Sequence, residues 1–396
     1  MVLGMSPWFA ASVVGPAMIR AWHAGPAVES WLTIAVQLGF VGGTLVSALL
    51  MLSDRWSPRR LAGASAFVAA LATAAVATPG LSPGGAIALR LATGAALAGV
   101  YPPGMKLAAG WWRDGRGLAI GVVVGALTLG SASPHLIRAA VPPDAWRWVL
   151  LLAGLSSAAA GVLFLATMRE GPYQAPSQPF DVHAISRVIG ARGVRLATGG
   201  YLGHMWELYA MWSAMAPFWI YVAALRGLAP ATAANLAFAT IGVGALGCVL
   251  AGRAADRVGR PLVTIVAMAI SAACALTVGS LIGGPMVVLV AVALVWGVSV
   301  VADSAQFSAL VTELAPQEYV GTALTLQTCL GFLLTIVTIR LVPVWAARWG
   351  WERAFLPLAI GPLLGIIAMW RLQRTPDHRG PESPSDSDRH TAGGRG

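Results

Sequence analysis

The chain has 396 residues, of which 57% are hydrophobic and 11% are charged, and its formal net charge is +10. About a quarter of the residues of a soluble domain are charged, so this composition excludes a water-soluble protein and indicates a membrane protein. The positive charge does not indicate nucleic-acid binding, because the basic residues lie in short loops between apolar runs and no basic face with aromatic residues is visible.

Twelve apolar runs follow one another along the chain, each close to the roughly 20 residues that cross a bilayer as a helix. The first six lie at about 2–20, 29–52, 61–78, 84–108, 117–137 and 147–168. The other six lie at about 197–223, 231–251, 262–282, 286–312, 320–343 and 353–371. The pattern predicts an all-α membrane protein with twelve transmembrane helices in two six-helix bundles.

One long polar segment separates the two sets of runs, and a second polar stretch ends the chain. This tail is rich in Pro, Ser, Asp, Gly and Arg, a composition typical of disorder. Within the first polar segment, Ile185–Arg195 has the pattern of an amphipathic surface helix. We therefore predict an N-terminal bundle at 1–168, a cytoplasmic linker at 169–196, a C-terminal bundle at 197–372 and a disordered cytoplasmic tail at 373–396.

The arginines predict the orientation, because loops on the cytoplasmic side of a membrane carry an excess of Lys and Arg. An even number of spans leaves both termini on one side. The loops on that side hold the larger basic set, which is Arg55, Arg59, Arg60, Lys106, Arg113, Arg116, Arg169, Arg187, Arg192, Arg195, Arg253, Arg257 and Arg260. The opposite side holds Arg20, Arg138, Arg147, Arg226, Arg348 and Arg353. We predict a multi-pass protein of the bacterial inner (plasma) membrane with both termini in the cytoplasm.

A short basic loop occurs twice, between runs eight and nine and between runs two and three. The second copy reads G-R-A-A-D-R-V-G-R at 252–260, and the first reads D-R-W-S-P-R-R at 54–60. Two such loops about 200 residues apart indicate a chain built from two related halves. The spacing G-x-x-x-D-R-x-G-R resembles the cytoplasmic loop signature of the major facilitator superfamily. The first copy departs from it, with Leu50 and Ser57 where glycines are expected.

This resemblance implies two six-helix bundles that rock about a site at the membrane midplane. Charged loop residues would pair across loop and helix ends in one state and separate in the other, as alternating access requires. The residues expected in these gating loops are Asp54, Arg55, Gly252, Asp256, Arg257 and Arg260.

Arg90 lies in the fourth apolar run, and ionisable groups inside spans are costly enough to be functional candidates. The stretch Arg90–Gly99 resembles a second family signature, R-x-x-x-G-x-G, with Ala96 in place of its second glycine. The resemblance implies a role for Arg90 in proton or substrate coupling. The alternative is an arginine that extends to the outer interface.

Four polar residues lie in the seventh and tenth runs: His204, Glu207, Asp303 and Gln306. Each carboxylate is about ten residues into its run, near mid-membrane, and His204 and Glu207 share a helix face. A desolvated carboxylate can exchange a proton near neutral pH, and a neighbouring histidine can relay it. The alternative is a carboxylate bonded to a partner helix. His204 and Glu207 could supply two metal ligands, but no third or fourth ligand is in sight, so we predict no metal and no cofactor.

In the family's fold, spans one, four, seven and ten line the central cavity. Arg90, Glu207 and Asp303 fall on three of these spans, so the resemblance implies that they meet around one aqueous chamber with a formal charge of −1. That charge suits proton exchange or a neutral or cationic substrate. The segment 111–119 resembles bacterial members assigned to small anions or monocarboxylates, yet spans two and eight lack the mid-membrane arginines of oxyanion carriers.

Other polar and aromatic residues in the runs have weaker functional patterns. His135 and Arg138, near the outer end of the fifth run, are predicted to lie at the interface. Four tryptophans could border a binding cavity or mark packing and interfacial belts: Trp8, Trp206, Trp212 and Trp219.

The sequence therefore predicts a secondary active transporter that moves a small solute by alternating access, coupled to protons. Its expected partners are a small-molecule substrate, protons and the lipid bilayer, and we expect a monomer. We do not expect an enzyme, because no nucleophile–base pair can be placed. We do not expect ATP-driven pumping either, because Lys106, the single lysine, does not lie in a phosphate-binding loop. Two alternatives stay open: proton-antiport efflux of amphipathic compounds, and a non-transporting membrane sensor or assembly protein on the same scaffold.

Overall fold

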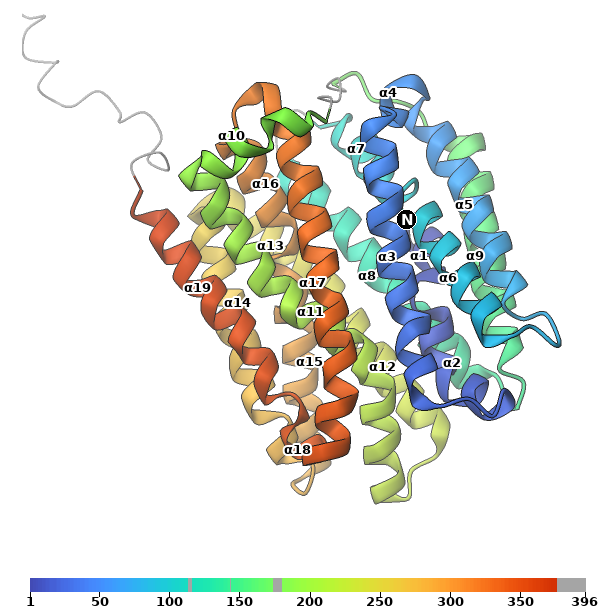
Figure 1. The fold of residues 1–396 in the computed structure, drawn as a ribbon. Coiled ribbons are helices and arrows are strands. Elements are labelled where there is room, and N and C mark those ends of the chain that lie inside the picture. Colours follow the sequence, from blue (N-terminus) through green and yellow to red (C-terminus); the bar gives the residue numbers. More distant parts are fainter. Residues whose placement is uncertain (113–115, 143, 174–179, 376–396) are drawn as a thin grey trace, which may run out of the picture.

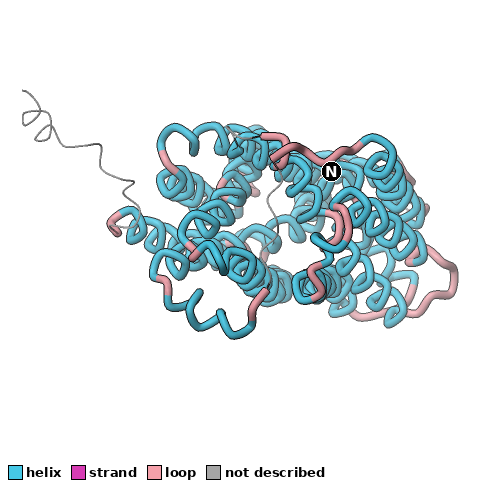
Figure 2. The backbone as a smooth tube through the Cα atoms, turned by 90° about the horizontal axis from the view of Figure 1, so that it is seen from above, coloured by secondary structure: helices cyan, strands magenta, loops and turns pink. Residues whose placement is uncertain are grey.

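The computed structural model describes residues 1–112, 116–142, 144–173 and 180–375, apart from the side chains of Pro26, Ser53, Asp54 and Arg116. The predicted tail at 373–396 thus lies almost wholly outside the described residues, as does part of the predicted linker. The described part is helical throughout, without strands. Its helices form two side-by-side groups, α1–α9 and α11–α19 (Figures 1 and 2).

The described residues of the N-terminal bundle form nine helical segments, because some spans are broken. They are α1 (Val2–Met5), α2 (Pro7–Ala21), α3 (Pro26–Leu49), α4 (Leu52–Arg55), α5 (Pro58–Ala75), α6 (Pro83–Leu97), α7 (Tyr101–Ala109), α8 (Arg116–Ala140) and α9 (Arg147–Thr167). A short 3-10 turn at Val182–Ala184 and α10 (Ile185–Gly190) then lead to the second bundle.

The C-terminal bundle repeats this plan. Its helices are α11 (Arg192–Arg226), α12 (Pro230–Gly242), α13 (Gly244–Val258), α14 (Arg260–Thr277), α15 (Met286–Ala302), α16 (Ser304–Leu314), α17 (Val320–Trp349), α18 (Trp351–Ala354) and α19 (Ile360–Gln373). Its 3-10 turns are Gly279–Leu281, Gln317–Tyr319 and Leu356–Ala359. Helix α11 begins at Arg192, inside the segment expected to be linker, because the polar residues before 197 extend the helix beyond its apolar part.

Ten helical segments of the described chain are long and apolar enough to cross a membrane. The other two predicted runs are also helical: the first is divided between α1 and α2, and the third is α5, which carries Arg59 and Arg60 in its first turn. The twelve predicted runs are therefore twelve helical passes within the described residues. The predicted fold class is correct.

Among the described residues, the bundles meet mainly where α8 packs against α12, α13 and α16 and where α3 packs against α17, and α2 also touches α11. Within the bundles, glycines allow backbones to touch, since small residues let helices approach closely in lipid. A Cβ on Gly94 of α6 would overlap the Val36 carbonyl of α3, and one on Gly297 of α15 would overlap the Thr240 carbonyl of α12.

We name the two ends of the molecule by their loops. The linker face is the end with α4, α10 and the α13–α14 turn at Gly259, and the opposite face is the end with the α2–α3 loop and α18. Figure 1 shows α4 and α10 at one end and α18 at the other.

Candidate functional site

Glu207 lies inside the C-terminal bundle, halfway along α11, with 2% of its surface exposed. Its Oε1 accepts a hydrogen bond from Trp296 Nε1 of α15 at 2.7 Å, and its Oε2 accepts one from Ser271 Oγ of α14 at 2.8 Å. A buried carboxylate is tolerated when its oxygens are bonded in this way. A serine hydroxyl can donate to a carboxylate or accept from a protonated acid, so this pocket suits both protonation states.

One turn closer to the linker face, His204 meets Asp303. His204 Nδ1 lies 2.9 Å from Asp303 Oδ1, and the two side chains are 1% and 2% exposed. Asp303 occupies the break between α15 and α16, and Tyr201 and Phe307 flank the imidazole. Among the described residues, His204 Nε2 has no hydrogen-bond partner, so the imidazole has one nitrogen left for a proton or a water.

The polar series continues to the linker face through Gln306, one turn beyond Asp303 on α16. Gln306 Oε1 accepts from Arg260 Nη1 at 2.9 Å, and Arg260 Nε donates to Glu313 Oε1 at 2.8 Å. The Glu313 side chain is 50% exposed. Gln306 and Arg260 were expected in two different sites, and the structure brings them together in one series.

Arg90 lies in the other bundle and is fully buried. Its guanidinium donates to the carbonyls of Pro7 (2.8 Å), Trp8 and Leu32 (3.4 Å), at the start of α2 and on α3. The structure therefore does not bring Arg90 together with Glu207 and Asp303 around one chamber. The sequence gives the depth of a residue in its span, but the rotation of each helix decides whether its side chain faces a cavity or its own bundle.

The second gating loop touches the first bundle. A Cβ on Gly117, the second residue of α8, would overlap the Asp256 carboxylate, and a Cβ on Gly252 would lie 2.7 Å from the Gly117 carbonyl oxygen. Gly252 thus permits close contact of α13 with α8. Arg55 and Arg257 are exposed at the linker face, while the side chain of Asp54 lies outside the described residues.

Six aromatic rings meet where the bundles face each other. Trp8, Phe9 and Phe40 come from α2 and α3, and Tyr209, Trp212 and Phe332 come from α11 and α17, with ring centroids 4.5–6.2 Å apart. We call them the ring cluster. The other tryptophans singled out in the sequence bond within the C-terminal bundle, Trp206 to the Pro357 carbonyl and Trp219 to Thr240.

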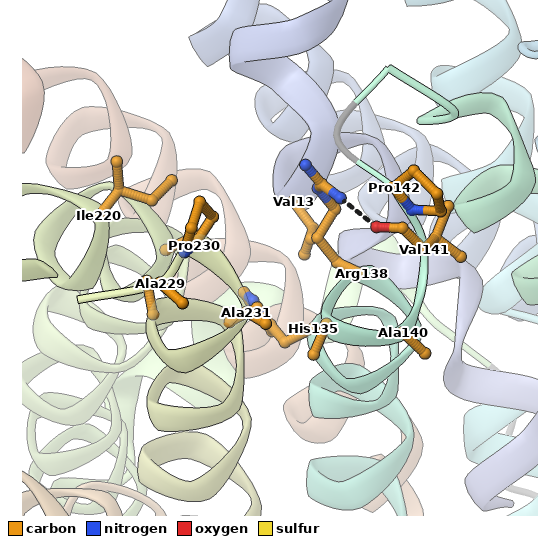
Figure 3. A pocket seen from close by; sticks show the side chains of 14 residues that line it. Val13, His135, Arg138, Ala140, Val141, Pro142, Ile220, Ala229, Pro230 and Ala231 are labelled. Carbon is orange, nitrogen blue, oxygen red and sulfur yellow. Dashed lines mark hydrogen bonds between the residues drawn. The ribbon is translucent and has the colours of Figure 1, made fainter. Parts of the chain in front are cut away.

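Two cavities lie between the bundles toward the opposite face, and the sequence pattern did not point to either. One, of about 450 Å³, is lined by residues of α2, α3, α11 and α17, including Glu29 and Tyr221. The other, of about 360 Å³, lies between α8 and α12 and is lined by His135 and Arg138 (Figure 3). Glu29 is the first charged residue inside the second apolar run, and a charge at that position was the one sign in the sequence of a polar cavity there.

The family profile described as Major Facilitator Superfamily matches residues 1–339 and, in a second match, residues 208–393. The chain therefore belongs to the major facilitator superfamily, a family of transporters and not of enzymes, as its sequence predicted. Among solved structures it is similar to the proton:xylose symporter XylE of this superfamily, bound to 6-bromo-6-deoxy-D-glucose. The TM-score is 0.71 at 13% identity over 93% of each chain, which shows a shared fold. No curated protein matches the chain.

Proposed function

We propose that the chain is a proton-coupled secondary transporter that moves a small solute across the bacterial inner membrane by alternating access. The observation that supports it is a set of polar groups buried in the C-terminal bundle: Glu207 bonded to Ser271 and Trp296, His204 beside Asp303, and Gln306 joined through Arg260 to exposed Glu313. Two carboxylates inside the hydrophobic layer are expensive to retain, and such groups commonly belong to proton relays.

In this proposal Glu207 binds the transported proton, and Ser271 and Trp296 hold it in either protonation state. His204 passes the proton between Glu207 and Asp303. Gln306, Arg260 and Glu313 then connect Asp303 to the linker face. We assign that face to the cytoplasm because the larger set of arginines lies there.

Proton binding at Asp303 reaches the neighbouring bundle through α13. Cys248 of α13 donates to the Val301 carbonyl at 3.6 Å, two residues before Asp303, and lies 3.9 Å from Thr128 of α8. A change in the charge of Asp303 thus acts beside the α8–α13 contact. Near the linker face, the same α8–α13 contact places Asp256 of the second gating loop beside Gly117 of α8. In this proposal, the packing of α13 on α8 is the contact that is formed in one state of the transport cycle and separated in the other.

The ring cluster favours a second candidate function, proton-antiport efflux of an amphipathic compound. Six aromatic side chains between the bundles offer stacking surfaces to a flat apolar solute once the bundles part. The residues that carry the proton are the same in both functions.

Reconstituted protein tests the proposal. Proteoliposomes with an internal pH dye are exposed to a panel of short monocarboxylates, sugars including xylose, and aromatic cations. We expect one class to drive proton flux, and Glu207→Gln to reduce that flux to background while the melting temperature stays near that of the wild type. The matched control is Glu318→Gln, an exposed carboxylate outside the series. Wild-type proton flux in Glu207→Gln would refute the assignment.

A further inference from the structure

We propose that the cavity between α8 and α12 binds a small carboxylate anion with a short apolar tail. The anion would bind there before the two bundles close around it. This inference rests on the proposed transport function and names the class of solute. The cavity holds about 360 Å³, within the size range of about 300–1,000 Å³ of small-molecule sites. Both bundles contribute to it, through α2 and α8 on one side and α11 and α12 on the other.

His135 has an unusual environment in this cavity. Its side chain is 2% exposed, and neither Nδ1 nor Nε2 has a hydrogen-bond partner among the described residues. Buried polar groups are nearly always bonded, so an imidazole with both nitrogens unpaired indicates a missing partner. Figure 3 shows the ring extending from α8 toward α12, across the cavity. A ligand oxygen in the cavity would accept a hydrogen bond from the imidazole N–H of His135.

Arg138 lies one turn from His135 and lines the same cavity. It donates from Nη1 to the Val141 carbonyl at 2.8 Å, which fixes the side chain and leaves most of its five N–H donors for a ligand. The planar guanidinium binds carboxylates through two parallel hydrogen bonds. Arg20 is near enough to interact with both Arg138 and Glu29 and does not line the cavity, so Arg138 is the cation that would meet the ligand.

The rest of the lining decides which anion fits. It consists of apolar side chains, with no acidic residue among the described lining residues: Val13, Ala139, Ala140, Val141, Pro142, Ala216, Ile220, Ala229, Pro230, Ala231, Ala233 and Ala234. The Arg138 guanidinium can neutralise a single carboxylate, the His135 N–H can donate to it, and the alanines and Ile220 can cover a short alkyl chain. A doubly charged inorganic anion would keep one charge that this single lining cation does not neutralise, and it has no apolar part for the alanines to cover. The neighbouring cavity contains the carboxyl group of Glu29 and is the less suitable of the two for an anion.

The proposed ligand agrees with the proposed proton site. A carboxylate that travels with one proton crosses the membrane without net charge, so the anion would bind at His135 and Arg138 while Glu207 takes the proton. Because α8 and α12 belong to different bundles, the ligand contacts both, and its binding energy depends on their separation.

Calorimetric titration of the purified full-length protein in detergent, without chloride, tests the inference. The probes are butyrate, the neutral isostere butyramide, and sulfate. We expect butyrate to bind, the other two probes to bind at least about tenfold more weakly, and Arg138→Gln and His135→Leu each to weaken butyrate binding at least about tenfold. The matched control, Arg348→Gln, changes an exposed arginine at the same face outside the cavity and should bind butyrate normally. Melting temperatures show which variants are folded. The test needs only one of the two cavity variants to be folded.

Several outcomes would overturn the inference: no butyrate binding, equal binding of butyramide or sulfate, or wild-type affinity in a folded cavity variant. Two separate readouts, butyrate binding in detergent and solute-driven proton flux in proteoliposomes, distinguish this inference from the proposed function. Butyrate binding without solute-driven proton flux would support the anion site and contradict the transport function. Proton flux driven by another solute, without butyrate binding, would support the transport function and contradict the anion site.

Discussion

Arg90 shows how one side chain can hold a membrane helix in place. Its guanidinium bonds to three backbone carbonyls at the α1–α2 break and on α3, so a full positive charge is compensated by peptide dipoles inside one bundle. This geometry favours a structural role over the coupling role that its sequence neighbourhood suggests. The two roles make different predictions.

We predict that Arg90→Lys lowers the melting temperature and leaves solute-driven proton flux per folded molecule near the wild-type value. An ammonium group has no planar fork and cannot reach three separated carbonyls, so at least one charged hydrogen bond, worth about 1.5–3 kcal/mol, is lost. Thermal unfolding in detergent and the proteoliposome assay measure the two effects. An unchanged melting temperature with proton flux abolished would instead support coupling through Arg90.

The candidate site could be predicted in part from single residues. Glu207 and Asp303 stand out because charge is rare in apolar runs, and the i, i+3 spacing placed His204 beside Glu207. Their partners could not be predicted, because Ser271 and Trp296 lie 64 and 89 residues from Glu207 and look like ordinary span residues. His135 was predicted to lie at the interface, since nothing in a single run shows that a cavity adjoins it.

At the scale of helices, the spans were predictable and their breaks were not. Among the described residues, five predicted continuous runs are divided, at Ser6, Ala98–Val100, Val243, Asp303 and Phe355–Ala359. Hydropathy averages over a run and does not detect where the regular pattern of helical hydrogen bonds is interrupted. The break at Asp303 is the consequential one, because it places the carboxylate where α15 ends and turns it to His204.

Helix contact through glycine gives a prediction for α3. A Cβ on Gly39 would overlap the Leu91 carbonyl of α6, whereas a Cβ on Gly42 of the same helix meets nothing within 4 Å. Gly39→Ala should therefore destabilise the protein by about 1–3 kcal/mol, because two backbones must move apart. Gly42→Ala is the matched control and should leave the melting temperature unchanged or raise it slightly. Equal melting temperatures for the two variants would contradict the close α3–α6 packing.

At the scale of the whole molecule, the second copy of the duplicated loop reaches the other bundle. The second copy carries Asp256 to the first turn of α8 in the other bundle, where a carboxylate interacts favourably with the positive end of the helix. The repeated spacing allowed the family and the two-bundle fold to be predicted. The contact of the second copy with α8 depends on how the two bundles pack together, and the pattern of the loop does not show that packing.

We predict that Asp256→Asn slows turnover and leaves the affinity for solute unchanged. The contact is exposed, so the lost stabilisation of the α8–α13 packing is modest, about 0.3–1 kcal/mol, and should change a rate by a small factor. Initial rates of uptake and equilibrium binding measure the two quantities separately. Asp144→Asn, another exposed carboxylate, is the control. Turnover equal to that of the wild type would argue against a gating role for this loop.

The contacts of the ring cluster limit how easily the two bundles part, and therefore how easily protons could cross without a solute. Five ring pairs cross from one bundle to the other among the described residues, and at about 0.5–1.5 kcal/mol each they contribute about 2.5–7.5 kcal/mol. A proton that moves through a potential of 100 mV supplies about 2.3 kcal/mol. An empty carrier would therefore stay shut when protonated, and the cargo itself has to compensate for the parted rings. In the proposed proton-coupled mechanism, such a lock would prevent the uncoupled dissipation of the ion gradient.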